Sequence, residues 1–191
     1  MKTIIFGTIE NFSLQKTLLI ALIGALIGQL MIILVGFLKK KINLQRKKSM
    51  ILNDLKNQNE ILDSLTKKHL ELADLFKRKQ VDTFTTSIFH TLQLDIYESI
   101  PKNELYQIFQ KDLFKLVDIY KSIEFLKNHS PYWIHRDYLE KSELHLEEEK
   151  NNSEHNFWCE THLGFIDIAL GNIENNFKTI NQIKKDIKEL K

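Results

Sequence analysis

Residues 17–38 have the sequence TLLIALIGALIGQLMIILVGFL, and this stretch decides the fold. It contains no charged side chain, and fourteen of its 22 residues are Leu, Ile, Val or Phe. A helix of this length spans roughly 33 Å, which matches the hydrocarbon core of a bilayer. The alternative is the core helix of a soluble protein, but such helices rarely keep so many consecutive uncharged positions. The stretch therefore predicts a transmembrane helix.

The flanking charges predict the direction of this helix. Residues 39–48 contain six cations and no acid, whereas residues 1–16 contain two lysines and one glutamate. The apolar run is longer than the roughly 7–15 residues of a signal-peptide core, and lysines follow it in place of a small-residue cleavage site. We therefore expect an uncleaved signal anchor in the cell membrane. The positive-inside rule predicts a short extracytoplasmic N-terminus at 1–16, a basic juxtamembrane collar at 39–48 on anionic lipid, and a cytoplasmic domain at 49–191.

Small residues mark one face of the predicted span. Gly24 and Gly28 form a GxxxG pair, and Ala21 and Ala25 form a second small pair beside it. Such spacing lets two helix backbones approach closely, and Gln29 can hydrogen-bond across the contact. The alternative is that glycine is simply common in membrane spans and that Gln29 is tolerated alone. We expect self-association through Gly24, Gly28 and Gln29.

Apolar residues recur at alternating steps of four and three after the collar. This seam predicts one helix, and its members are Ile51, Leu55, Gln58, Leu62, Leu65, His69, Leu72 and Phe76. A polar residue such as Gln58 in a seam can fix register or oligomer number, so we expect a role for it in oligomerisation. A helix that packs inside its own chain shows nearly the same pattern, and so short a run cannot separate the two.

The rest of the chain also favours helices. The scarcity of proline and glycine argues against a β-rich fold, and the single cysteine excludes an intramolecular disulfide framework. We expect the seam to break at 77–80 and further helices at about 81–100, 102–128, 131–150 and 154–191. In the first of these, the alternation of Leu92, Leu94 and Ile96 would also allow a short strand. The last has isoleucines seven residues apart, interrupted by Asn176. The prediction is an all-α protein, with one N-terminal transmembrane helix and a cytoplasmic helical bundle whose first and last helices are coiled-coil-like.

Two clusters are candidate sites for chemistry. His155, Cys159 and His162 share one helical face and are plausible zinc ligands, but Cys159 and His162 also occupy seam positions where core residues belong. A Cys/His nucleophile pair is disfavoured because this neighbourhood is acidic. The second cluster predicts a pocket for a stacked base or a nucleotide-like anion, with a purely structural aromatic core as the alternative. Its members are Trp133, His135, Arg136, Tyr138 and Trp158.

Catalytic and nucleic-acid signatures are absent from the sequence. It contains no Gly-rich phosphate loop, no HExxH and no GxSxG, so we expect a non-enzymatic protein without a cofactor. Residues 49–191 have a net charge of −5, which argues against binding to duplex nucleic acid. The expected partners are membrane lipid, a second copy of the chain and a protein partner.

One stretch resembles a known family. Residues 84–100, FTTSIFHTLQLDIYESI, are similar to a segment of bacterial membrane proteins of phage abortive infection. Those proteins also place a helical cytoplasmic region behind N-terminal spans, often two where this chain has one. The resemblance covers less than a tenth of the chain and supplies no site residue. It implies an alternative to the interaction protein: a membrane effector of anti-phage defence that responds to an intracellular signal. In that case we expect the cluster near Trp133 and Tyr138 to bind a nucleotide-like signal, and clustering of the spans to perturb the membrane.

Overall fold

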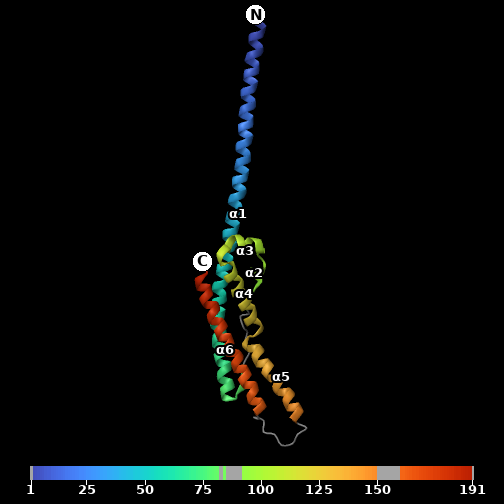
Figure 1. Cartoon of the computed structure of the whole chain (residues 1–191), viewed down its shortest axis with the longest axis vertical. Helices are drawn as coiled ribbons and strands as arrows, with labels where there is room; N and C mark the ends of the chain where they lie inside the picture. Colours follow the sequence, from blue (N-terminus) through green and yellow to red (C-terminus); the bar gives the residue numbers. More distant parts are fainter. Residues whose placement is uncertain (1, 82–83, 85–91, 150–159, 191) are drawn as a thin grey trace. The chain divides into compact units, whose positions relative to one another are not determined.

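The computed structural model describes residues 2–81, 84, 92–149 and 160–190, and Figure 1 shows their arrangement. All regular structure in these ranges is helical, with no strand, which confirms the all-α prediction. The chain divides into two compact units, residues 1–46 and residues 47–191. The first helix, α1 (Lys2–Arg78), contributes to both.

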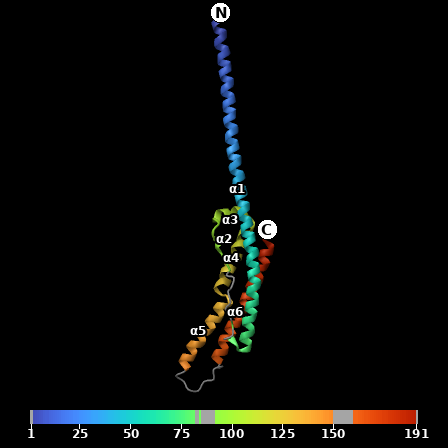
Figure 2. The same cartoon turned by 180° about the vertical axis from the view of Figure 1, so that it is seen from behind.

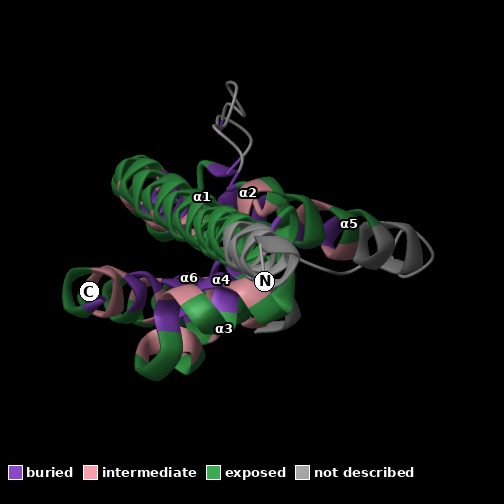
Figure 3. Ribbon diagram, turned by 90° about the horizontal axis from the view of Figure 1, so that it is seen from above, coloured by how far each residue is buried: buried purple, intermediate pink, exposed green. Residues whose placement is uncertain are grey.

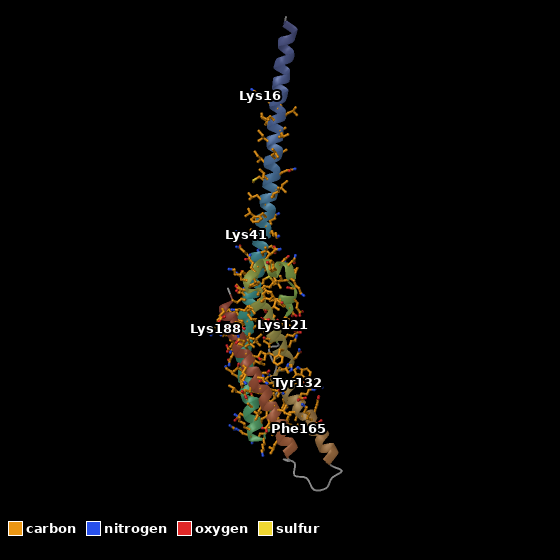
Figure 4. All side chains as sticks on the ribbon, viewed as in Figure 1. Lys16, Lys41, Lys121, Tyr132, Phe165 and Lys188 are labelled. Atoms are coloured by element: carbon orange, nitrogen blue, oxygen red, sulfur yellow. The ribbon has the colours of Figure 1, made fainter. Side chains whose placement is uncertain are left out.

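Residues 17–38 are helical, as the apolar stretch predicts. The most apolar window of this helix has a mean hydropathy of 2.8, and none of it is buried in the protein. The large side chains between Leu18 and Leu38 are 43–73% exposed. In Figure 4 they project on all sides of the helix between Lys16 and Lys41. By length and composition this helix is a candidate membrane span.

The predicted seam of α1 is buried along its whole length. Each of its eight residues, from Ile51 to Phe76, is at most 6% exposed. The helix ends at Arg78, where Lys79 takes a left-handed φ of 60° and the Gln80 amide donates to Leu75 O at 3.0 Å. This left-handed cap satisfies carbonyls of the last turn, and the break falls within the predicted 77–80.

The helix expected over 81–100 is wrong for the residues that the structure describes. Residues 92–94 are not helical, and only α2 (Asp95–Glu98) forms a single turn before Pro101. The carbonyl of Gln93 accepts a hydrogen bond from the buried Gln58 side chain at 2.8 Å, and Leu92 enters the core. These tertiary contacts override the apolar spacing that favoured a helix.

The single helix expected over 102–128 is also wrong, because the chain turns in its middle. The structure has α3 (Lys102–Phe109), a 3₁₀ turn η2 (Gln110–Asp112) and α4 (Leu113–Asn128). The break is at Gln110, whose φ of 41° lies in the left-handed region. The break separates the two helices, and buried residues of both, among them Leu105, Phe109 and Leu116, belong to one core cluster.

Two further helices complete residues 47–191. Ser130 and Pro131 begin α5 (Pro131–Glu149) as predicted, with Ser130 O accepting the Ile134 amide at 3.1 Å. The last helix, α6 (Glu160–Glu189), buries Asn176 and the isoleucines of its predicted seam at 166, 173 and 180.

Both seams pack within this chain. One core cluster joins the first half of the α1 seam to α3, α4 and the end of α6, and a second joins its last turns to α5 and the start of α6. Figures 1 and 2 show residues 47–78 beside α6, and Figure 3 shows buried residues on the inward faces of α4 and α6.

Candidate functional site

The small-residue face of the span has no partner in the part of the chain that the structure describes. A Cβ atom added at Gly24, Gly28 or Gly36 would meet no atom within 4 Å. Gln29 on the same helix is exposed. The feature expected to mediate association is therefore available for contact with another helix.

Gln58 lies inside the core of residues 47–191. Its Nε2 donates to Gln93 O at 2.8 Å and makes a longer contact of 3.4 Å with Asp54 Oδ1. Its Oε1 is buried and finds no hydrogen-bond partner among the described residues. Gln58 thus ties α1 to the segment before α2. Its expected role in oligomerisation stays a prediction.

A buried carboxyl group lies beside Gln58. Tyr120 donates its hydroxyl to Asp54 Oδ2 at 2.5 Å, and both residues are at most 6% exposed. Burial, together with this hydrogen bond and the charge of Asp54, raises the pKa of Tyr120. The Tyr97 ring stacks on Tyr120 with centroids 4.2 Å apart and planes at 15°. The group therefore links α1, α2 and α4.

His69 forms a second polar junction. Its Nδ1 lies 2.9 Å from Leu65 O and its Nε2 lies 2.8 Å from Asn176 Nδ2. The carbonyl of Leu65 can only accept, so Nδ1 holds the proton and Nε2 accepts from Asn176. Asn176 also donates to His129 O at 2.5 Å. Burial lowers the pKa of His69 to about 4, so the ring is neutral and joins α1 to α4 and α6.

The aromatic cluster of α5 divides between two faces. His135 and Tyr138 are buried: His135 Nε2 lies 3.0 Å from Val81 O, and Tyr138 packs edge-on against Phe76. Trp133 and Arg136 are exposed, with the guanidinium 5.2 Å from the indole centroid. The structure therefore brings Trp133 and Arg136 together but not with the other two. Trp158 lies outside the described residues.

The predicted zinc ligands are not described. His155, Cys159 and the side chain of His162 lie outside the described part of the chain. Within the ranges that the structure does describe, no group of three His, Cys, Asp or Glu side chains is arranged to hold a metal ion.

The structure contains a pocket that sequence reasoning missed. It has a volume of about 400 Å³ and lies between α2, α3 and α4. Apolar side chains such as Leu105 and Leu113 line it together with the stacked Tyr97 and Tyr120, and four charged residues complete the lining, namely Glu98, Lys102, Lys121 and Glu124. Its walls meet only because the chain breaks at Gln110, and the sequence has no local signal for that break.

Comparison with known proteins assigns no family. No protein-family model matches the chain, and no curated protein or solved structure matches it significantly.

Proposed function

We propose that this chain is a non-enzymatic, single-pass membrane protein that self-associates through its span and presents residues 47–191 to a cytoplasmic protein partner. One observation supports this most directly. The Gly24 and Gly28 face is open: beyond the backbone of their own helix and their chain neighbours, no atom of the described chain lies within 4 Å of a Cβ added there. In contrast, the polar seam residues Gln58 and Asn176 have hydrogen-bond partners within their own chain.

The physics of helix association in lipid favours the span as the contact. Lipid tails are as apolar as leucine, so helices associate through close backbone packing and interhelical hydrogen bonds. Gly24 and Gly28 provide the close approach. Gln29 supplies a hydrogen-bonding group near the middle of the span, for which measured contributions are about 0.6–2 kcal/mol.

The orientation follows from the charges. Six cations in residues 39–48 keep the following domain on the cytoplasmic side and hold the collar on anionic headgroups. The exposed surface of residues 47–191 is then offered to the cytoplasm, where a partner can bind.

The test is the mass of the full-length protein in mild detergent and in lipid nanodiscs. We expect an oligomer that Gly28→Leu converts to a monomer, because the larger side chain separates the backbones. Leu30→Phe is the matched control: it adds bulk two positions later, on the opposite side of the helix, and should leave the mass unchanged. A monomeric wild-type protein, or an unchanged mass in Gly28→Leu, refutes the proposal.

A second candidate is a ligand-gated membrane effector of bacterial anti-phage defence. The pocket of about 400 Å³ favours it, because its tyrosine rings suit a base and its cations Lys102 and Lys121 suit a phosphate, although Glu98 and Glu124 line the pocket as well. This reading predicts growth arrest on overexpression that Gly28→Leu abolishes, and thermal stabilisation of the full-length protein by a nucleotide that Lys121→Ala prevents. Harmless overexpression with a stable copurifying protein favours the interaction protein.

A further inference from the structure

The most exposed large hydrophobic side chain of the described residues is not in the span. Phe114, at the start of α4, is 81% exposed, whereas no span residue exceeds 73%. Tyr106 in α3 is 63% exposed. The two aromatic residues lie on either side of the break at Gln110. Each exposed ring leaves apolar surface in water, and the two belong to helices that follow one another in the chain.

The exposed charged side chains of this segment are lysines, whereas exposed acids lie just before it, at residues 95 and 98. The exposed residues between 101 and 114 include Lys102 and Lys111 but no acid. The two acids of this segment, Glu104 and Asp112, are half-buried, and Glu104 pairs with Lys47. Farther along α4, exposed acids return, as at residues 118 and 124. We call this set of residues the aromatic–lysine face; its members are Lys102, Tyr106, Lys111 and Phe114.

The aromatic–lysine face lies at the end of residues 47–191 where the chain enters this unit. Lys47 forms the ion pair with Glu104, and the Lys48 ammonium lies 5.9 Å from the centroid of the Phe109 ring. Ile51 and Leu105 belong to the same core cluster. Figures 1 and 2 both show α3 beside the first turns of this unit.

The length of the collar keeps this face near the membrane. Nine residues separate Leu38, the last apolar residue of the span, from Lys48. They cover about 14 Å as a helix, and at most about 32 Å if fully extended. The polar headgroup layer adds roughly 5–8 Å outside the hydrocarbon core. The anchor therefore holds the aromatic–lysine face within reach of the lipid surface.

We propose that the aromatic–lysine face rests on an anionic membrane surface, with Phe114 and Tyr106 in the interface and Lys102 and Lys111 on lipid headgroups. The inference depends on the membrane anchoring that the proposed function includes. Aromatic rings prefer the interfacial layer, and lysines are drawn to acidic lipids. Two rings alone bind a bilayer weakly, but the anchor makes the contact intramolecular and gives it a high effective concentration. The surface would thereby set the orientation of the cytoplasmic domain.

The test places a fluorescent reporter on the face in the full-length protein. Phe114→Trp is reconstituted in vesicles of phosphatidylcholine, with and without phosphatidylserine, that contain brominated lipid as a quencher. Phe125→Trp is the matched control, because residue 125 lies on the same side of α4, about 16 Å farther along the helix. Wild-type emission, from Trp133 and Trp158, is subtracted from each spectrum.

The proposal predicts that the Phe114→Trp signal shifts to the blue and is quenched by the brominated lipid, more strongly with phosphatidylserine. The Phe125→Trp signal should stay unquenched. Replacing Lys102 and Lys111 by glutamine should remove the dependence on phosphatidylserine. An unquenched Phe114→Trp signal, or equal quenching of both reporters, overturns the inference.

Flotation of the same vesicles separates this result from a failure of the anchor. If the protein floats with the vesicles and the Phe114→Trp signal stays unquenched, the inference is wrong and the proposed function stands. If the protein does not float, the anchoring itself is wrong and both fall. Far-ultraviolet circular dichroism of each variant, expected to match wild type, checks that the exposed substitutions leave the fold intact.

Discussion

Acid should destabilise residues 47–191 through one buried side chain, His69. Its ring is fully buried, with Nδ1 donating to Leu65 O and Nε2 accepting from Asn176, an arrangement that fits the neutral form. Burial lowers the pKa of His69 from 6.5 to about 4. In the unfolded chain the ring titrates near its ordinary value. As the pH falls, the unfolded state therefore binds the proton first and is favoured.

The pKa values set the size and the pH window of this effect. The lowering of the His69 pKa from 6.5 in the unfolded chain to about 4 in the folded protein corresponds to about 3 kcal/mol of folding free energy. This stability is fully present above about pH 7 and is lost as the pH falls toward about 4, below which this group adds no further loss. Three kcal/mol is a large part of the 5–15 kcal/mol typical of a domain, so the change is measurable.

The assay is urea unfolding of the full-length protein in a non-ionic detergent, followed by circular dichroism at a series of pH values. His69→Gln removes the titrating ring, and the informative quantity is the difference in pH dependence between wild type and variant. The comparison is needed because lysine partners also lower the pKa values of Glu174 and Glu189. These two groups therefore add a loss of stability at low pH that is the same in wild type and variant. If both proteins lose stability in parallel between about pH 7 and pH 4, the assignment to His69 is refuted.

Three further predictions concern the same core and use the same unfolding assay. Asn176→Asp places a carboxylate beside Nε2 of His69 and should raise the pKa of that ring. Acid should then no longer lower the free energy of unfolding through His69; an unchanged pH dependence contradicts this. Tyr120→Phe should cost about 2 kcal/mol, because the buried Asp54 loses its hydroxyl donor; a neutral effect would mean that the bond contributes nothing. Leu62→Ala should cost about 2–5 kcal/mol, whereas its control Leu70→Ala, at a position 57% exposed, should change stability by less than about 0.5 kcal/mol.

The burial pattern of α1 was predictable because it depends on local periodicity. Residues that recur every three or four positions share a helix face, so the seam from Ile51 to Phe76 and its end near Arg78 follow from sequence. The break at Gln110 was not predictable on this basis. Glutamine has no preference for a left-handed conformation, and the apolar spacing continues across the break through Phe109, Leu113 and Leu116. Only packing on both sides of the turn defines it.

Some polar groups of the core could be recognised in the sequence, but their hydrogen-bond partners could not. Gln58 and Asn176 were recognisable as interruptions of apolar seams, but their partners were not, since Gln93 O and His129 O are backbone groups of distant segments. Asp54 gave no sequence signal at all. It precedes the seam residue Leu55 and resembles a solvated position until Tyr120, 66 residues later, is placed against it. Long-range pairing of this kind is invisible to periodicity.

A polar residue in an apolar seam can indicate packing within one chain or packing between two chains. Whether its hydrogen-bonding groups find partners in its own chain distinguishes the two cases. A buried polar group without a partner costs about 1–3 kcal/mol, so a seam of unsatisfied groups would favour a second chain that supplies the partners. Gln58, His69 and Asn176 find partners inside their own unit, and of this set only Gln58 Oε1 lacks one among the described residues. The core of residues 47–191 therefore gains little from a second copy. The open face at Gly24 and Gly28 has no such partner among the residues that the structure describes. Association should therefore use the span, and a fragment of residues 47–191 should be a monomer where the full chain is not.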